Sequence, residues 1–254
     1  MSQKVAIVTG ASRGIGKQLS IDLARAGYDV ACVARSSSAR PSKLPGTVDE
    51  TAEAVRAQGR LALAEGLDVR DEQAVASLAE RVYDSWGRCD LLVNNAAVAP
   101  PRPALEDSTG RWRLAVDVNL NGPFYFAYYL CGRMAKHGGG HVINVSSAAA
   151  VYPQFGRASY TATKRALEGM TEALAHDLRD QVAVNCLRID VPVYSEGFEF
   201  TMPGDYSEYE DPVIISDAVQ WMVRQPLTHT GRIHTVSGLR ADGVVREPTP
   251  HARG

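Results

Sequence analysis

A tyrosine and a lysine stand four residues apart in the stretch GRASYTATKRALEGMTEALAHDLRD, which covers residues 156–180. The stretch predicts one long helix, and positions i and i+4 share a face of a helix. A positive charge beside a phenol favours the phenolate, so we expect Lys164 to lower the pKa of Tyr160 from its ordinary value of about 10. The pair would then donate and accept a proton near neutral pH.

The alternative is that Tyr160 and Lys164 lie on an ordinary solvated helix face. Small and apolar residues recur at helical spacing on a different side of the same stretch, namely Ala162, Ala166, Met170 and Leu174. We expect that side to pack against the core and the Tyr160 and Lys164 edge to face elsewhere. Other parts of the chain must therefore decide between proton transfer and a solvated surface.

The size and composition of the chain fit a single α/β domain. It has 254 residues, of which 45% are hydrophobic and 22% charged, with a net charge of -2. These values predict one domain over residues 1–246 and a flexible tail over residues 247–254. The charge offers no basic surface for nucleic acid, and no apolar segment reaches the ~20 residues of a membrane helix. Because the chain begins with a strand-like run and no leader, we expect a cytoplasmic protein.

The four cysteines give no sign of a metal site. Cys32, Cys89, Cys131 and Cys186 stand far apart, without paired spacing and without a histidine cluster beside them. This pattern argues against a zinc site and against a disulfide framework. We therefore expect buried free thiols and no bound metal.

Strand-like and helix-like segments alternate along the chain. Apolar runs are separated by stretches of helical spacing. The predicted strands are residues 4–9, 29–34, 61–67, 90–93, 141–145, 182–188 and 232–236. The predicted helices include residues 17–27, 47–59, 71–86, 108–136, 156–180 and 216–225. This alternation predicts a single-domain Rossmann fold, a doubly wound seven-stranded parallel sheet with helices on both faces.

A glycine-rich turn joins the first predicted strand to the first predicted helix. Glycines at such a turn let the backbone approach a pyrophosphate, which the helix N-terminus attracts. A plain strand-to-helix loop is the alternative, but the position between a clear strand and a clear helix favours a dinucleotide site. The residues expected to contact the cofactor here are Gly10, Ser12, Arg13, Gly14, Ile15 and Gly16.

The second predicted strand ends in Arg35 and Ser36, where an acidic residue would bind the ribose hydroxyls of NAD. No acid is present there. Arginine fits a phosphate well, so Arg35 would meet the 2′-phosphate of NADP, and Arg13 could add a second positive charge. The sequence thus favours NADP(H) over NAD(H), although each arginine could also be a solvated surface charge.

Polar and small residues follow the third and fourth predicted strands. Asp68, followed by Val69, could accept a hydrogen bond from the adenine amino group or could cap the next helix. Asn95, Ala96 and Ala97 follow the fourth strand, at the edge where open parallel sheets bind ligands. Asn119 lies inside the predicted helix 108–136, where its amide would order water or cap a local bend.

Together these motifs resemble the classical short-chain dehydrogenase/reductases over residues 5–187. The resemblance rests on the turn from Thr9 to Gly16, on Asp68-Val69, on Asn94-Asn95-Ala96-Ala97, on Asn119 and Ser147, and on Tyr160-x-x-x-Lys164. Ordered motifs at family-like intervals are far more specific than any one of them alone. The resemblance therefore favours proton transfer over a solvated face for the Tyr160 helix.

The resemblance implies a role for each matched residue. Tyr160 would be the general acid and base, and Lys164 would lower its pKa and hold the nicotinamide ribose. Ser147, rather than its neighbour Ser146, would bind the substrate oxygen, and Asn119 would anchor a chain of water molecules. The reaction would be hydride exchange between NADP(H) and a small carbonyl or alcohol substrate. The family also pairs subunits through the aromatic-rich helix and the Tyr160 helix, which implies a homodimer or homotetramer.

Two positions depart from the family pattern. Ala97 stands where the family usually has glycine, a mild change near the cofactor. After the sixth strand, Ile189 and Asp190 replace the usual Pro-Gly, and their side chains could crowd or recharge the nicotinamide site. This exit and the loop Lys43-Leu44-Pro45-Gly46-Thr47 resemble an outlying branch that includes the hydroxysteroid-dehydrogenase-like proteins. Ile189 would then contact the nicotinamide.

Residues 190–212 are expected to form a lid over the substrate. The segment has no lysine or arginine, and an acidic, aromatic lid argues for a neutral or cationic, partly apolar ketone or alcohol. The alternative is that its charges face water. After Asp190, its acidic residues are Glu196, Glu199, Asp205, Glu208, Glu210 and Asp211, and its aromatic residues are Tyr194, Phe198, Phe200, Tyr206 and Tyr209.

Two other functions are compatible with the same motifs. Ile189 and Asp190 could block productive hydride geometry and leave a cofactor-binding regulatory or redox-sensing module. An epimerase or dehydratase could also use this fold, without net oxidation of the cofactor. Retention of Asn119, Ser147, Tyr160 and Lys164 favours an NADP-dependent carbonyl reductase or alcohol dehydrogenase over both.

Overall fold

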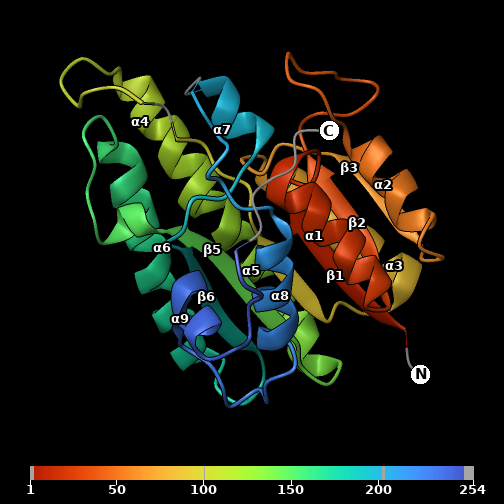
Figure 1. The fold of residues 1–254 in the computed structure, drawn as a ribbon. Helices are drawn as coiled ribbons and strands as arrows, with labels where there is room; N and C mark the ends of the chain where they lie inside the picture. Colours follow the sequence, from red (N-terminus) through yellow and green to blue (C-terminus); the bar gives the residue numbers. More distant parts are fainter. Residues whose placement is uncertain (1–2, 100, 202–203, 249–254) are drawn as a thin grey trace.

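The computed structural model describes residues 3–99, 101–201 and 204–248, and they form a seven-stranded parallel sheet (Figure 1). The strand order is β3-β2-β1-β4-β5-β6-β7. The strands are β1 Lys4–Thr9, β2 Tyr28–Ala34, β3 Ala62–Gly66, β4 Leu91–Asn94, β5 His141–Ser147, β6 Ala183–Ile189 and β7 Ile233–Thr235. The predicted doubly wound seven-stranded sheet is confirmed.

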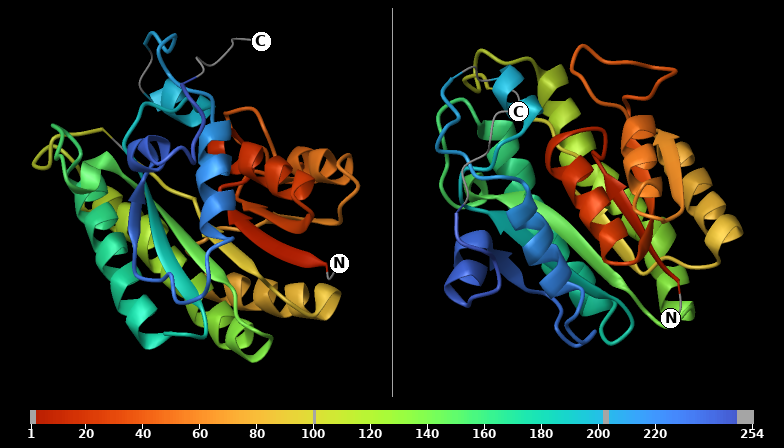
Figure 2. Two further views of the ribbon diagram at one scale, coloured as in Figure 1. Left: turned by 60° about the horizontal axis from the view of Figure 1, so that its bottom comes forward. Right: turned by 45° about the vertical axis from the view of Figure 1, so that its right-hand side comes forward.

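Helices cover both faces of this sheet (Figure 2). Helices α1, α2, α8 and α9 pack on one face, and α3, α5 and α6 pack on the other. The longer helices are α1 Gly14–Arg25, α2 Val48–Arg56, α3 Glu72–Trp86, α4 Thr109–Val116, α5 Gly122–Lys136, α6 Ala158–Asp177 and α8 Val213–Met222. The shorter ones are α7 Glu196–Thr201, α9 Val236–Ala241 and the 3-10 turn Ala148–Ala150.

The side chains of β1 show why the strands read as continuous apolar runs. Ala6 and Val8 enter one hydrophobic core, while Val5 and Ile7 enter the other. Successive side chains of a strand point to opposite faces, so a sheet covered on both sides needs apolar residues at every position. The sheet therefore separates two cores, and its carboxyl edge remains open to a ligand.

The helix predicted over residues 108–136 is interrupted. A π-helical turn, Asp117–Asn121, separates α4 from α5 and contains Asn119. The wider turn breaks the regular helical hydrogen bonding, which the apolar pattern of the sequence does not reveal. The predicted helical stretch is present from Thr109 to Lys136, and the π-helical turn lies at Asn119, where a local bend was one of the two expectations.

The buried face of α6 also differs from the prediction. Ala162 and Ala166 are exposed, whereas Thr163, Lys164 and Leu167 are buried. The face that carries Lys164 packs against the sheet because Lys164 and its neighbours find polar partners there. The small-residue side, which we expected in the core, lies on the surface of the chain.

The C-terminal elements start earlier than expected. Helix α8 begins at Val213 rather than at residue 216, and α9 follows β7 directly although the sequence did not predict it. Most of the predicted flexible tail, residues 249–254, lies outside the described residues. The same holds for Met202 and Pro203 within the predicted lid.

All four cysteines are buried free thiols. Burial raises the pKa of Cys32, Cys131 and Cys186 to about 12, so these thiols stay protonated at neutral pH. Among the described helices, none has the length and apolar character needed to cross a membrane.

Candidate active site

A pocket of about 630 Å³ opens at the carboxyl edge of the sheet, between the glycine turn and α6. It gathers residues that follow six different strands. The predicted site residues that line it are Gly10, Ser12, Arg13, Gly14, Ile15, Gly16, Arg35, Ser36, Asp68, Val69, Asn95, Ala96, Ala97, Ser147, Tyr160, Lys164 and Ile189. Asn119 is the one predicted site residue that is not among the lining residues.

The glycine turn has a geometry that fits a dinucleotide. Gly10 and Gly14 have φ values of 69° and 52°, in the left-handed region that favours glycine. A Cβ atom on Gly16 would lie 2.3 Å from the backbone oxygen of Gly10, so a side chain there would break the packing of helix on strand. Because these glycines lack side chains, the chain can turn tightly, a pyrophosphate can come close to the backbone, and the helix can pack against the strand.

The two arginines near the expected adenosine site have different surroundings. The guanidinium of Arg13 binds the loop after β2, with Nη2 at 3.1 Å from Ser36 Oγ and 2.8 Å from Ser42 Oγ. Its Nε donates to the backbone oxygen of Pro45 at 2.8 Å. Arg35 is exposed and makes no hydrogen bond or ion pair with the residues that the structure describes. Arg13 therefore holds the loop, and Arg35 is the accessible cation.

Asp68 does not cap the helix that follows it. The N-cap of α3 is Asp71, whose side chain accepts from Ala74 N at 3.0 Å. The carboxylate of Asp68 instead binds Arg70, with Nη2 to Oδ2 at 2.7 Å. Burial opposes ionisation, but hydrogen bonds from Arg70 lower the pKa of Asp68. The capping alternative is therefore wrong, and Asp68 stays a candidate for the adenine contact.

Asn95 ties the ends of two strands together. Its backbone N–H donates to Thr9 Oγ1 at 2.9 Å, and its Nδ2 donates to Thr9 O at 2.8 Å. These bonds join the end of β4 to the start of the glycine turn after β1. Asn95 thereby holds the glycine turn in place, and it also lines the pocket.

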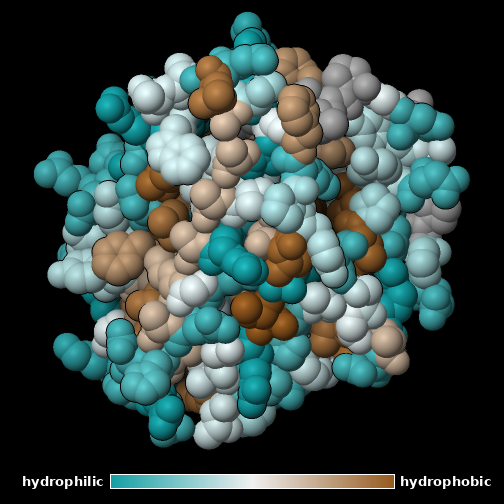
Figure 3. Space-filling model, turned by 90° about the vertical axis from the view of Figure 1, so that its left-hand side faces the viewer, coloured by the Kyte–Doolittle hydropathy of each residue, from teal (hydrophilic) through white to brown (hydrophobic). Residues whose placement is uncertain are grey.

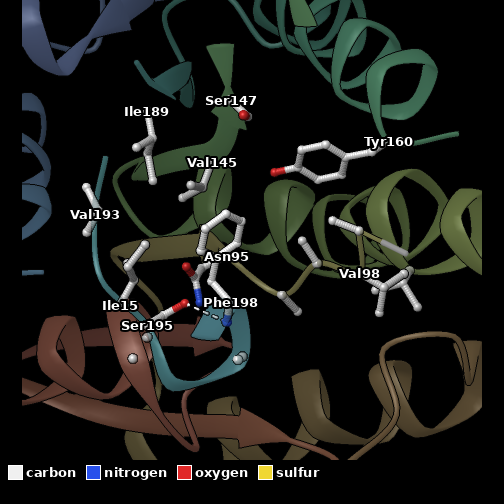
Figure 4. A pocket seen from close by; sticks show the side chains of 18 of the residues that line it. Ile15, Asn95, Val98, Val145, Ser147, Tyr160, Ile189, Val193, Ser195 and Phe198 are labelled. Carbon is white, nitrogen blue, oxygen red and sulfur yellow. Dashed lines mark hydrogen bonds between the residues drawn. The ribbon is translucent and has the colours of Figure 1, made fainter. Parts of the chain in front are cut away.

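The hydroxyl groups of Tyr160 and Ser147 point toward one another across the pocket (Figure 4). Burial raises the pKa of Tyr160, while a hydrogen bond with Ser147 and the charge of Arg157 act to lower it. The net lowering that we expected from Lys164 is thus not found, because desolvation of the phenolate dominates. Ser147 also accepts from Ala149 N at 3.3 Å, at the start of the 3-10 turn.

Lys164 is buried, with 3% of its surface exposed. Its Nζ donates to the backbone oxygen of Val145 at 2.6 Å and lies 5.6 Å from the centroid of the Tyr160 ring. Burial lowers the pKa of Lys164 to about 8, and the negative charge of Glu168 opposes this lowering. Lys164 thus has a pKa close to neutrality in a position beside the tyrosine.

Glu168, one turn after Lys164, joins the ends of two strands. It accepts from Ser146 Oγ at 2.7 Å and forms an ion pair with Arg188 at 2.7 Å. Ser146 therefore has a packing partner of its own, which agrees with the choice of Ser147 as the hydroxyl that faces the pocket. The Glu168 contacts hold β5 and β6 where the site residues leave the sheet.

Asn119 is fully buried and clamps a backbone segment next to the pocket. Val98 N donates to its Oδ1 at 2.8 Å, and its Nδ2 donates to Val98 O at 2.9 Å. Nδ2 also lies 3.1 Å from Thr163 Oγ1 on α6. The π-helical turn aims this amide at Val98, which lines the pocket, so Asn119 positions the wall rather than forming it.

The replacement of Pro-Gly by Ile189 and Asp190 has a structural explanation. The carboxylate of Asp190 accepts from Ser237 N at 3.0 Å and from the Ser237 hydroxyl. Its charge therefore serves the start of α9 on the other side of β6. Ile189 points into the pocket beside Val145 (Figure 4). Asp190 also lines the pocket, so both residues that replace Pro-Gly face it, although the Asp190 carboxylate is bound to Ser237.

Arg157 is a site residue that the sequence reasoning missed. It lies three residues before Tyr160, lines the pocket and is 6% exposed. Its Nη1 donates to Ala99 O at 2.5 Å, in the segment that Asn119 also clamps. Its spacing from Tyr160 at the start of a helix is the one signal that could have pointed to it.

Several acidic residues of the lid have partners within the protein. Glu210 is buried in an ion pair with Arg240, and Glu199 accepts from the Tyr194 hydroxyl at 2.6 Å. Phe198, Tyr206 and Tyr209 pack edge to face or tilted against one another. The acidic composition of the lid therefore stabilises the lid itself and is a weaker guide to substrate charge than the sequence suggested.

Comparisons with known proteins agree with this geometry. The sequence pattern of the family described as short chain dehydrogenase matches residues 4–191. Hydroxysteroid dehydrogenase-like protein 2 of Bos taurus is 30% identical over 241 residues, which cover 93% of this chain and 57% of that protein. The chain thus spans about half the length of the curated relatives it matches.

Solved structures share the fold. A 7α-hydroxysteroid dehydrogenase complexed with NADH and 7-oxo glycochenodeoxycholic acid is 26% identical with a TM-score of 0.82, covering 97% of this chain and 96% of that one. A metagenomic short-chain oxidoreductase in complex with NADP is 29% identical with a TM-score of 0.76, covering 91% and 95%. Because the family pattern covers most of the chain, and because the fold and the glycine turn agree with it, the chain belongs to the short-chain dehydrogenase family.

Proposed function

We propose that this protein is an oxidoreductase that exchanges a hydride between NADP(H) and the carbonyl or alcohol group of a small molecule. The observation that carries the proposal is the convergence of the Tyr160 and Ser147 hydroxyls in the pocket that the glycine turn lines. When bound there, the nicotinamide supplies or accepts the hydride. The protein supplies the proton, the orientation and the exclusion of water.

The residues divide these tasks by position. Tyr160 donates its phenolic proton to the substrate oxygen during reduction and accepts it during oxidation. Ser147 donates a hydrogen bond to the same oxygen and fixes its place beside Tyr160. Lys164, anchored on Val145 O, adds a positive charge where the phenolate forms. Asn119 keeps Val98 in place, so that the wall opposite Tyr160 does not move.

The preference for NADP(H) is supported by Arg35. Its guanidinium is exposed, lines the pocket at the end of β2 and forms no ion pair with the described residues, although its charge acts on Asp68. A 2′-phosphate at the adenosine ribose would receive a bidentate contact from it. Ser36 and the loop that Arg13 holds complete the polar surroundings.

The substrate side of the pocket supports a partly apolar ketone or alcohol. Small and aliphatic side chains line it, together with Phe198 and Tyr209 from the lid. The aliphatic lining residues on this side are Val98, Ala99, Ala149, Val191 and Val193. Such a wall fits a cyclic or aromatic substrate better than a compact, highly charged one.

We also propose that the protein assembles as a homodimer or homotetramer. The exposed face of α6 carries Ala162 and Ala166, and α5 exposes Phe124 and Tyr128, which are 44% and 67% accessible. Figure 3 shows the side of the molecule on which α6 lies, with a band of apolar side chains across it. Sedimentation of the wild type and of Ala166→Glu tests this, since a charge on that face should favour the monomer.

One experiment separates the proposed reaction from its alternatives. Purified protein is mixed with NADPH and a panel of aromatic, cyclic and steroid-like ketones, and the absorbance of the reduced cofactor is followed. Oxidation of NADPH with at least one ketone supports the reductase. Tight NADPH binding without turnover across a broad panel would support a binding or redox-sensing module. Conversion of a substrate without net cofactor oxidation would indicate an epimerase or dehydratase.

A further inference from the structure

Two residues at the start of α7 lie directly against the second glycine of the glycine turn. A Cβ atom built on Gly14 would be 2.9 Å from Ser195 Cβ and 3.3 Å from Glu196 Oε2. Ser195 and Ile15 are neighbours in the close view of the pocket (Figure 4). The first turn of α7 therefore covers the N-terminus of α1 at van der Waals distance.

The place that these residues fill is the one a cofactor pyrophosphate would need. In a turn of this type the second glycine lacks a side chain so that the pyrophosphate can approach the backbone. In this protein the groups that lie close to the backbone of Gly14 are Ser195 and the carboxylate of Glu196. A carboxylate is attracted to this place for the same reason as a phosphate, because the N–H groups of a helix N-terminus are positive.

The contact is not stabilised by hydrogen bonds to Glu196. Its Oε2 atom is buried and accepts no hydrogen bond from the residues that the structure describes. Burial lowers the pKa of nearby Arg13, and the negative charge of Glu196 opposes that lowering. A buried carboxylate oxygen without a hydrogen-bond donor destabilises the position of the Glu196 side chain. The side chain can therefore leave Gly14 at little cost in free energy.

We propose that Glu196 competes with the cofactor pyrophosphate for the glycine turn and thereby limits the affinity for the dinucleotide. The inference rests on the proposed cofactor site. A bound pyrophosphate would meet a like charge and the Ser195 side chain, so the first turn of α7 must move outward when the cofactor enters. Ser195 Oγ accepts from Phe198 N at 3.2 Å, which lets the turn move as a unit with the lid aromatics.

The test compares the affinities of charge-neutral variants. Glu196→Gln keeps the volume of the side chain and removes its charge. Glu208→Gln makes the same change on an exposed residue of the lid that is not among the nearest neighbours of Gly14. The dissociation constants of NADPH and NADH are measured by the fluorescence of the reduced nicotinamide, so the readout is independent of turnover. Adenosine 2′-phosphate, which lacks the pyrophosphate, is measured by calorimetry as a further control.

We expect Glu196→Gln to bind NADPH and NADH about tenfold more tightly than the wild type, since one like-charge contact is removed near a surface. Glu208→Gln and the affinity for adenosine 2′-phosphate should be unchanged. The gain should shrink in high salt, which screens the repulsion.

Three results would overturn the inference. Equal or weaker dinucleotide binding by Glu196→Gln, with normal binding by the wild type, would remove Glu196 from control of the site and leave the proposed function standing. An equal gain for adenosine 2′-phosphate would show a general effect of charge rather than competition at Gly14. Failure of both proteins to bind either dinucleotide would overturn the proposed function as well.

Discussion

Lys164 donates a hydrogen bond of 2.6 Å from Nζ to the backbone oxygen of Val145. The bond joins α6 to β5 just before Ser147, so the same contact sets the distance between the helix that carries Tyr160 and the strand that ends in Ser147. It also buries the lysine charge, and burial lowers the pKa of Lys164 to about 8. The buried charge of Lys164 therefore lowers the free energy of unfolding by an amount that depends on pH.

The stability of the protein should reveal this cost. Below about pH 8 the folded protein keeps Lys164 charged in a buried place, and the cost is fully present. Between about pH 8 and the ordinary pKa of 10.5 the unfolded chain binds more protons than the folded one, so this group makes the free energy of unfolding rise with pH. Relative to Lys164→Met, the wild type should gain about 3 kcal/mol across this window.

The comparison with Lys164→Met is necessary because other groups titrate in the same range. Burial raises the pKa of Cys32 and Cys131, and these thiols lower the stability as pH rises in both proteins. Denaturant unfolding of both proteins from pH 7 to 10 gives the difference directly. If the difference in the free energy of unfolding between the two proteins stays constant across this range, the pKa of Lys164 is not lowered to about 8.

Tyr160→Phe should lose nearly all turnover and keep its cofactor. Phenylalanine preserves the ring that packs near Lys164 but cannot exchange a proton with the substrate oxygen. Positioned proton transfer contributes about 10²–10⁴-fold, so kcat should fall by that factor while NADPH fluorescence reports unchanged binding. Rates near those of the wild type would rule out Tyr160 as the acid and base.

Arg157→Gln should shift the pH dependence of alcohol oxidation upward. The charge of Arg157 acts to lower the pKa of Tyr160, and the phenolate is the form that accepts the proton from an alcohol. Without that charge the pKa rises, and the rate should reach its plateau at a pH about 1 unit higher. Arg165→Gln, an exposed change on the same helix, is the control and should leave the profile in place.

Arg35→Asp should change the choice of cofactor. The substitution removes the exposed cation at the end of β2 and adds a carboxylate that repels a 2′-phosphate. NADPH affinity should fall by about 10- to 100-fold, while NADH affinity changes little. Arg40→Asp, in the same loop but away from the pocket, serves as the control. Equal losses of affinity for NADPH and NADH would show that Arg35 does not bind the 2′-phosphate.

Asp190→Ala should destabilise the protein more than it affects chemistry. The carboxylate of Asp190 binds Ser237 at the first turn of α9, and loss of such a contact costs about 1 kcal/mol. Ser237→Ala removes the hydroxyl contact but keeps the backbone N–H that Asp190 also binds, so it should cost less than Asp190→Ala, and the double variant should cost less than the sum. Thermal unfolding of the four proteins measures this coupling. Additive losses would mean that the two residues act separately.

Much of the fold followed from local patterns. The strand from residue 4 to 9, the glycine turn and the first helix form a contiguous unit whose residues contact one another. The alternation of apolar runs and helical stretches then predicted a parallel sheet. The helical stretch predicted across Asn119 is present, but the sequence did not predict its π-helical turn or the contact of the Asn119 amide with Val98, 21 residues earlier.

The candidate site was predictable where its residues are near neighbours in sequence. Tyr160 and Lys164 share a helix face by spacing alone. That the face is buried depends on Val145 from another strand, and the expected burial of Ala162 and Ala166 failed for this reason. Arg13 lines the pocket, and its guanidinium also binds a loop more than 20 residues away, which the spacing of the residues did not predict.

The family, the order of the elements and the residue types available for proton transfer and for holding a dinucleotide could all be predicted before the fold was known. These depend on short-range rules of turn geometry and helical spacing. Only the tertiary structure decided which charge meets which partner: Asp190 with Ser237, Glu210 with Arg240, and Glu196 against Gly14. Such pairings join segments far apart in the chain, and the burial that sets their energies exists only once the chain has folded.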